Sequence, residues 1–258
     1  MSYKDMKDYV VSLLNKDTRM DGRKLTEYRQ PTKIELNISK NAEGSAKVTL
    51  GETEVIVGIK LNVGEPFSDT PDEGVLIVGV ELLPLSSPEF ESGPPRAEAI
   101  EIARIVDRGI RESGMIDTKK LCIRKGELVW MVYLDIYTLN DAGNLIDASA
   151  LAAVAALKNT VFPKLNNDKV IFGEHTKEKL PLKRMPITCT IYKIGDKIVI
   201  DPNEKEQKVI DARLTIAISE DKNINALQKG GNKGLSIEDI DSMIDIAQEK
   251  TNELRKLI

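Results

Sequence analysis

The chain has 258 residues, with 37 Lys or Arg against 41 Asp or Glu, and a formal net charge of −4. This balance excludes the general basic surface of a free-standing nucleic-acid-binding protein. One histidine and two cysteines are too few for a Cys/His zinc site or a disulfide framework, so we expect two unpaired thiols in a reducing compartment. The most apolar stretches, 75–85 and 148–157, are too short to span a bilayer, and no signal peptide is recognisable. We therefore expect a cytoplasmic protein that does not contact a membrane.

The first part of the chain is predicted to be a helix followed by strands. Apolar residues at helical spacing predict a helix over 4–14. Short runs rich in β-branched residues predict strands over 33–38, 46–50, 54–61 and 75–83. After a loop rich in Pro and Ser, a second helix is predicted from about Arg96 to Gly114, because Gly is the favoured residue just past a helix. A long strand is predicted over 128–139.

An alanine-rich helix comes next, and its small side chains indicate close packing against a sheet. We expect Asp147 or Ser149 to cap its N-terminus. Residues 159–183 are polar and interrupted by Pro and Gly, which favours a loop over a regular element. We therefore place a boundary there and divide the chain into subdomains 1–165 and 166–258.

The second subdomain repeats the order of strands followed by a helix. Strands are predicted over 187–194, 197–201, 212–219 and 224–227. A long helix closes the chain from Ser236, which forms a capping-box pattern with Asp239 three residues later. Strands grouped apart from helices, mostly joined by short turns, indicate an α+β fold with largely antiparallel sheets.

An acidic cluster in the second half has two interpretations. Asp201, Glu204, Glu206 and Asp211 could hold a metal ion or form an acid/base pair, or they could form a solvated turn paired with the interspersed lysines. The single histidine, His175, lies in the polar segment, where a surface position is the simpler interpretation. The standard phosphate-binding loop patterns are absent from the sequence.

The predicted second helix carries a stripe of arginines. At about 100° per residue, Arg104, Arg108 and Arg111 fall within roughly 60° of one another, opposite the apolar face. One interpretation is a salt-bridged surface helix with Glu101–Arg104 and Asp107–Arg111 pairs. The other is a site for an anionic partner, since planar guanidinium groups suit phosphates.

The order of several short motifs along the chain is specific in combination. These are Arg19-Met20-Asp21-Gly22-Arg23, Gly44-Ser45-Ala46, Leu50-Gly51-Glu52-Thr53, Ala103-Arg104-Ile105-Val106-Asp107-Arg108, Leu134-Asp135-Ile136-Tyr137, Asp141-Ala142-Gly143 and Ile200-Asp201-Pro202-Asn203-Glu204-Lys205-Glu206. In this order the chain resembles the ribonuclease PH family over nearly its whole length, and within it the non-catalytic ring subunits of the archaeal exosome. The resemblance implies the ribonuclease PH fold, with two β-sheet-plus-helix subdomains.

The resemblance also implies which reaction the active members of the family catalyse, and that this chain lacks the residues for it. Active members of the family use inorganic phosphate to cleave the 3′-terminal linkage of RNA, with a Ser-Arg pair after the Asp-Ala-Gly turn and an Asp after a Glu in the second half. Asn144-Leu145 stands at the first place, and Gln207 follows Glu206 at the second. We therefore expect no catalytic residues, no cofactor and no metal. The alternative is an active phosphate-dependent 3′–5′ exoribonuclease that uses Asp211 and the acidic turn.

The role implied by the resemblance is that of a partner subunit. Such subunits alternate with an active ribonuclease PH-like subunit in a hexameric ring of three heterodimers, which RNA-binding cap proteins contact. The single-stranded 3′ end of RNA threads through the ring. Two arginines four residues apart hold the RNA backbone beside the active site of the partner, and they match Arg104 and Arg108. Arg96 and Arg111 are further candidates on weaker grounds.

Overall fold

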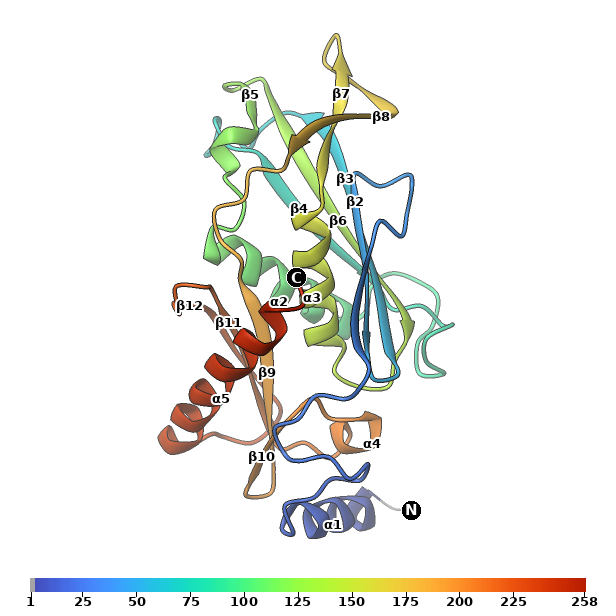
Figure 1. The fold of residues 1–258 in the computed structure, drawn as a ribbon, viewed down its shortest axis with the longest axis vertical. Coiled ribbons are helices and arrows are strands. Elements are labelled where there is room, and N and C mark those ends of the chain that lie inside the picture. The colour runs from blue at the N-terminus through green and yellow to red at the C-terminus, as the bar shows by residue number, and fades with distance from the viewer. Residues whose placement is uncertain (1–2) are drawn as a thin grey trace.

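The first sheet forms the upper part of the molecule in Figure 1, a computed structural model that describes residues 3–258. Its strands run in the order β1-β2-β3-β6-β4, with β5 paired to β6. Their bounds are β1 Thr32–Leu36, β2 Gly44–Leu50, β3 Thr53–Gly64, β4 Val75–Glu81, β5 Cys122–Arg124 and β6 Leu128–Asn140. All pairings are antiparallel except that of β4 with β6, which is parallel.

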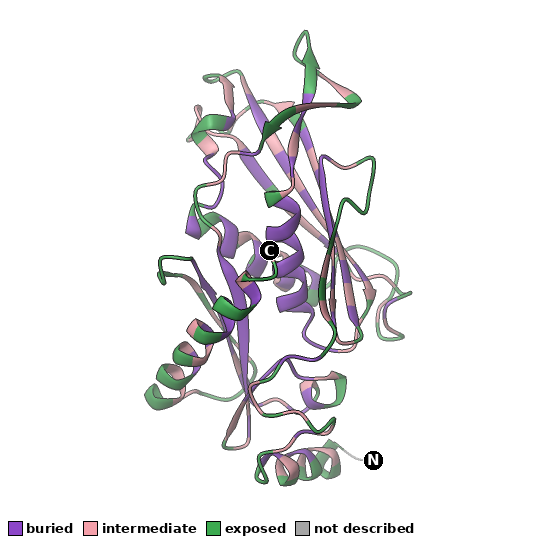
Figure 2. Cartoon of the chain, viewed as in Figure 1, coloured by how far each residue is buried: buried purple, intermediate pink, exposed green. Residues whose placement is uncertain are grey.

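Helix α3, Leu145–Lys158, lies at the centre of the molecule and packs against β2 and β3. Residues 145–157 of this helix are all buried, and Figure 2 shows this buried core between the two sheets. Its six alanines let the helix approach the sheet closely, as predicted. Strand β3 alternates buried with half-buried positions, the period-2 pattern of a sheet with one face on the core. Helix α2, Ala97–Ser113, packs beside α3 and ends at Gly114 in a left-handed conformation.

The second sheet lies below the first and has the order β10-β9-β11-β12, with antiparallel pairing throughout. The bounds are β9 Ile187–Ile194, β10 Lys197–Ile200, β11 Ala212–Ile218 and β12 Ile224–Gly230. Helix α5, Ile237–Arg255, packs on β9 and β11, and α2 contacts β11 and β12. The predicted capping box is confirmed, since Ser236 and Asp239 exchange side-chain and backbone hydrogen bonds.

The N-terminal helix α1, Tyr3–Leu14, packs on the second half of the chain. Val10 and Leu14 are buried in a small cluster with Tyr192, Ile194 and Val199. The short helix α4, Glu204–Gln207, lies nearby. The division into 1–165 and 166–258 stays a prediction; α1 belongs to the first part by sequence and packs on residues of the second.

Two sequence predictions are wrong. The segment predicted as a loop forms a hairpin of β7, Val161–Asn166, and β8, Lys169–Lys179. Most of β8 is exposed on both faces, so it lacks the apolar alternation that marks a strand. Asp147 and Ser149 do not cap α3, because the helix starts two residues earlier at Leu145 and buries both side chains. The 3₁₀ turn Thr118–Leu121 was not predicted.

Two further observations concern the cysteines and the helices of the described residues. Cys122 and Cys189 are unpaired thiols, as predicted. Across residues 3–258, no helix combines the length and the apolar composition needed to cross a membrane.

Candidate nucleic-acid interface

Helix α2 presents an exposed row of arginines on the side opposite its core contacts. Ile102, Val106 and Ile110 are buried against the rest of the protein. Arg104 and Arg108 are exposed on the other side. The amphipathic arrangement predicted from the sequence is therefore confirmed.

The four arginines of α2 and its N-terminus differ in whether a carboxylate already holds them. Arg96 pairs with Glu91, and Arg111 forms two hydrogen bonds to Asp107, at 2.6 and 3.1 Å. The predicted Asp107–Arg111 pair is thus confirmed. Arg104 and Arg108, in contrast, make no hydrogen bond or ion pair with any residue of 3–258.

The predicted Glu101–Arg104 pair is wrong. Glu101 instead pairs with Arg213 of β11, with Oε1 and Nη2 2.6 Å apart. The second sheet packs against α2 and brings Arg213 to the helix, which the sequence spacing within α2 could not reveal. As a result, Glu101 does not pair with Arg104 within the helix.

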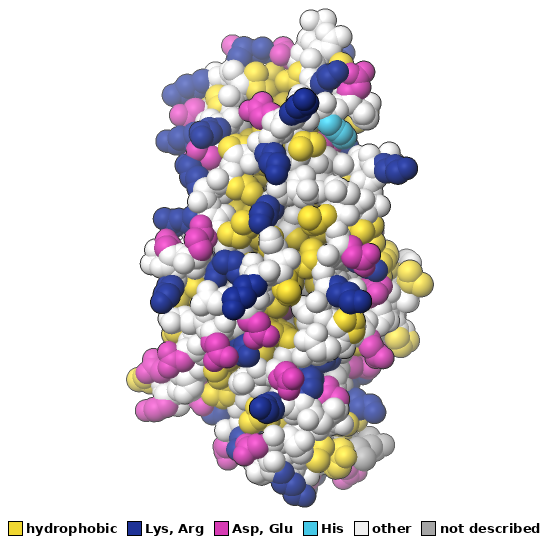
Figure 3. Space-filling model, in the orientation of Figure 1, with side chains coloured by type: hydrophobic (Ala, Val, Ile, Leu, Met, Phe, Trp, Pro, Cys, Tyr) yellow, Lys and Arg dark blue, Asp and Glu magenta, His cyan; other side chains and the backbone are white. Residues whose placement is uncertain are grey.

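Arg104 and Arg108 border an open groove of about 890 Å³. The groove lies between α2 and the edge of the second sheet, and it is lined by Ala97, Glu98, Ile100, Glu101, Arg104, Arg108, Arg213 and Gln228. Three guanidinium groups and two carboxylates thus share one surface. Elsewhere the charges are mixed: on the face in Figure 3, acidic side chains gather over α5, and basic ones are spread mainly over the upper part.

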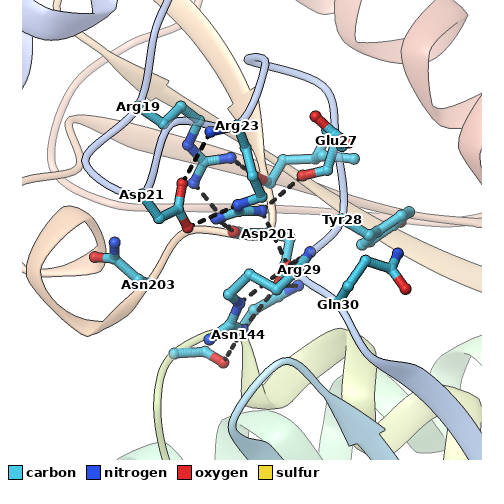
Figure 4. A network of polar contacts seen from close by, with 12 residues as sticks. Arg19, Asp21, Arg23, Glu27, Tyr28, Arg29, Gln30, Asn144, Asp201 and Asn203 are labelled. Carbon is cyan, nitrogen blue, oxygen red and sulfur yellow. Dashed lines mark hydrogen bonds and ion pairs between the residues drawn. The ribbon is translucent and has the colours of Figure 1, made fainter.

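A second cluster of arginines connects the two halves of the protein (Figure 4). Asp201, which is fully buried, accepts hydrogen bonds from the backbone N–H, Nε and Nη2 of Arg29 at 2.7, 3.0 and 2.8 Å. Arg29 also donates to the carbonyl oxygens of Ala142 and Gly143 at 2.6 and 2.8 Å. The Asp-Ala-Gly turn of the first half is thereby held to the second half.

The four acidic residues of the second half lie in different surroundings. Glu204 is exposed and pairs with Lys208 at 2.7 Å, as expected for a solvated turn with interspersed lysines, whereas Asp201 is buried. Glu206 is buried and pairs with the buried Arg19. Asp211 pairs with Lys7 and Lys233; burial raises the pKa of this carboxyl, but these contacts and the Gly195 N–H outweigh burial and lower it overall. Within 3–258, no three His, Cys, Asp or Glu side chains are grouped to hold a metal ion.

The residues at the expected phosphate position form a narrow, largely buried corner. Leu145 is buried, and the backbone N–H of Asn144 donates to Oε1 of Gln207 at 2.7 Å. The pocket beside Leu145 and Gln207 has a volume of about 60 Å³ and is also lined by Glu98, Glu101 and Arg213. Burial, and then the nearby carboxylates of Asp141, Glu89 and Glu101, raise the pKa of Glu98. This corner therefore offers a phosphate little room.

Comparison with known proteins gives the family. Models of the 3′ exoribonuclease family match the chain in two parts, domain 1 over residues 28–163 and domain 2 over residues 184–250. The chain belongs to the 3′ exoribonuclease family. Its sequence is 52% identical to the exosome complex component Rrp42 of Methanosarcina acetivorans, over 97% of this chain and 92% of that protein.

Solved structures of family members agree with the fold. A chain of the Archaeoglobus fulgidus exosome with RNA bound to the active site is 45% identical, with a TM-score of 0.90 over 98% of both chains. A chain of an archaeal exosome core is 43% identical, with a TM-score of 0.87 over 98% of this chain and 96% of that one. The predicted resemblance and the ribonuclease PH fold are confirmed. The roles of Arg104 and Arg108 stay predictions.

The sequence did not reveal all the residues that shape this region. Arg19, Arg29 and Arg213 were not singled out for their contacts, since each pairs with a carboxylate far away in the sequence. The match of the motif around Arg19 to the family was the available signal for the first of these. Arg213 stands in an apolar strand, where a lone charge is a sign of a specific partner.

Proposed function

We propose that this chain is a ring subunit of an archaeal-type exosome, in which it positions RNA and does not catalyse. Relatives named as exosome component Rrp42 are similar to it over nearly their whole length, and a similar chain belongs to an exosome with RNA at the active site. On this basis it assembles with an active ribonuclease PH-like subunit into a hexameric ring of three heterodimers. It works in the cytoplasm, on the single-stranded 3′ end of RNA, with RNA-binding cap proteins on the ring.

The absence of catalysis is supported by the corner around Leu145. Phosphorolysis needs donors that offset the charge of the attacking phosphate, and Leu145 supplies neither a donor nor a charge. Gln207 is neutral, and its Oε1 is already occupied by a backbone N–H. Asp211 is paired with Lys7 and Lys233, and it is not among the residues that line the pocket beside Leu145.

The contrast among the arginines of α2 carries the RNA-binding proposal. Arg104 and Arg108 lie one turn apart on an open groove and have no internal counterion among residues 3–258. Two like charges at this spacing destabilise a helix by a few tenths of a kcal/mol, roughly, and a phosphate between them reverses that cost. Because no ion pair must break first, the full charge of both guanidinium groups is available to RNA.

The test is to replace both arginines in the assembled ring. Arg104→Ala with Arg108→Ala removes two phosphate contacts, so the slope of log affinity against log salt is expected to fall by about 1.4, at roughly 0.7 per contact for a single strand. RNA binding and turnover decrease while light scattering shows an intact ring. Fluorescence anisotropy with labelled RNA at several salt concentrations measures the slope.

A matched control is available on the same helix. Arg96→Ala with Arg111→Ala makes the same change of net charge but removes arginines that are already paired with Glu91 and Asp107. It is expected to change the slope by less than half as much. Equal effects of the two double variants would show that only overall charge matters, and an unaltered slope in Arg104/Arg108→Ala would refute the proposed RNA contact.

A further inference from the structure

Arg213 is an unusual residue for its position. It lies on β11, directly opposite Gly230 of β12, and its side chain is 13% exposed. Its Nε and Nη2 atoms are buried and make no hydrogen bond with residues 3–258. The carboxylate of Glu101, 2.6 Å from Nη2, is its counterion. Among residues 3–258, the ion-pair partner of this nearly buried arginine is Glu101, which belongs to the helix of the RNA-binding arginines.

Glu101 is the natural competitor of RNA for Arg104. The two residues are three positions apart on α2, a spacing at which Glu and Arg side chains pair readily on a helix surface. Both also line the same open groove. A carboxylate left free there would neutralise Arg104 and repel the phosphates of RNA. In the structure neither happens, because Glu101 is turned to Arg213.

The second sheet is built to keep Arg213 in this place. A Cβ atom added at Gly230 would lie 2.6 Å from Cζ and 2.7 Å from Nη1 of Arg213. Gly230 does not have the positive φ angle that would demand glycine, so the requirement is for space. The missing side chain at 230 lets the guanidinium group lie across β12 and reach Glu101.

We infer that Arg213 is a positioning residue that withdraws Glu101 from Arg104 and so keeps Arg104 available to the RNA backbone. This inference rests on the proposed function for its consequence in RNA binding. Arg213 acts through Glu101, and its own contact with RNA is not required. The arrangement adds one neutral ion pair to the floor of the groove and leaves the charges of Arg104 and Arg108 uncompensated.

The test is a double-substitution cycle in the assembled ring, measured as RNA affinity at fixed salt. Arg213→Gln is expected to weaken binding roughly fivefold, the size expected for one charge contact near a protein surface. Glu101→Gln together with Arg213→Gln removes the competitor as well, so affinity is expected to return to within about twofold of the unaltered ring. A double variant as weak as Arg213→Gln would overturn the inference, and so would an Arg213→Gln ring with unchanged affinity.

A second pair of variants covers the case in which Arg213→Gln does not fold. Gly230→Ala displaces the guanidinium group and is expected to weaken RNA binding in the same direction. Gly234→Ala is the control, since a Cβ there would meet no atom within 4 Å and its φ angle is ordinary. Equal RNA affinity of these two rings would contradict the inference.

One readout needs no RNA and separates this inference from the proposed function. In a crystal structure of the Arg213→Gln chain, Glu101 is expected within 4 Å of the Arg104 guanidinium group. Glu101 pointing away from Arg104 in that structure would overturn the inference, whether or not Arg104 binds RNA. Glu101 could pair with Arg104 in the Arg213→Gln chain while Arg104→Ala with Arg108→Ala leaves RNA binding intact. The proposed RNA contact would then fail, but the inference that Arg213 withdraws Glu101 from Arg104 would stand.

Discussion

Replacing Asp201 by Asn tests the buried connection between the two halves of the chain. Asp201 is fully buried and accepts three hydrogen bonds from Arg29, one from Arg23 at 3.3 Å and one from Asn144 at 3.1 Å. The amide keeps one acceptor but leaves two largely buried guanidinium groups without this counterion. Breaking a buried ion pair on one side costs about 3–5 kcal/mol, because the remaining charge stays desolvated.

The assay is urea unfolding of the isolated chain, followed by circular dichroism, with stability taken from the midpoint at constant slope. The control is Asp168→Asn, which breaks an exposed pair with Arg124 and is expected to leave the urea midpoint nearly unchanged. A loss of under about 1 kcal/mol for Asp201→Asn would refute the reasoning. It would mean that Arg29 holds the Asp-Ala-Gly turn without needing Asp201.

Two further predictions concern buried carboxylates. Burial raises the pKa of Asp147 to about 7, against hydrogen bonds from Thr190 that lower it, so the folded chain binds a proton that the unfolded chain releases near pH 4. The free energy of unfolding of the wild-type chain is therefore expected to fall relative to that of Asp147→Asn as pH rises from about 4 to 7, and the difference is expected to stay constant above pH 8. Urea titrations at each pH measure this difference. A difference that stays the same from pH 4 to 8 would contradict the prediction. Asp211→Asn breaks the pairs with Lys7 and Lys233, so it is expected to lower the free energy of unfolding by about 1–3 kcal/mol while ring phosphorolysis stays within about twofold. A collapse of activity in a folded ring would instead support an active enzyme that uses Asp211.

Regular elements with one buried face were predictable because their periodicity is local. The arginine row of α2 was found in this way, as were β3 and the capping box at Ser236. Strand β8 was missed because both of its faces are largely exposed, so no apolar alternation marks it. The start of α3 was misplaced because Asn144 adopts a left-handed conformation (φ 57°) that its tertiary contacts hold.

The contacts that define the candidate site could not be predicted because they join distant parts of the chain. Arg29 and Asp201 are 172 residues apart, and Arg19 and Glu206 are 187 apart. From sequence alone, Asp201 and Glu206 belong to a lysine-rich acidic turn, and only folding shows that arginines from the N-terminal segment bury them. For the same reason helical spacing favoured Arg104 as the partner of Glu101, whereas the second sheet supplies Arg213.

The central claim is that this chain positions RNA for a catalytic partner and has no activity of its own. The most direct measurement is phosphate-dependent release of nucleoside diphosphates from the 3′ end of single-stranded RNA by the purified chain, and by the chain mixed with its ribonuclease PH-like partner. We predict no release by the chain alone, release by the mixture, and slower release when the mixture contains Arg104→Ala with Arg108→Ala. Release by the chain alone would contradict the account.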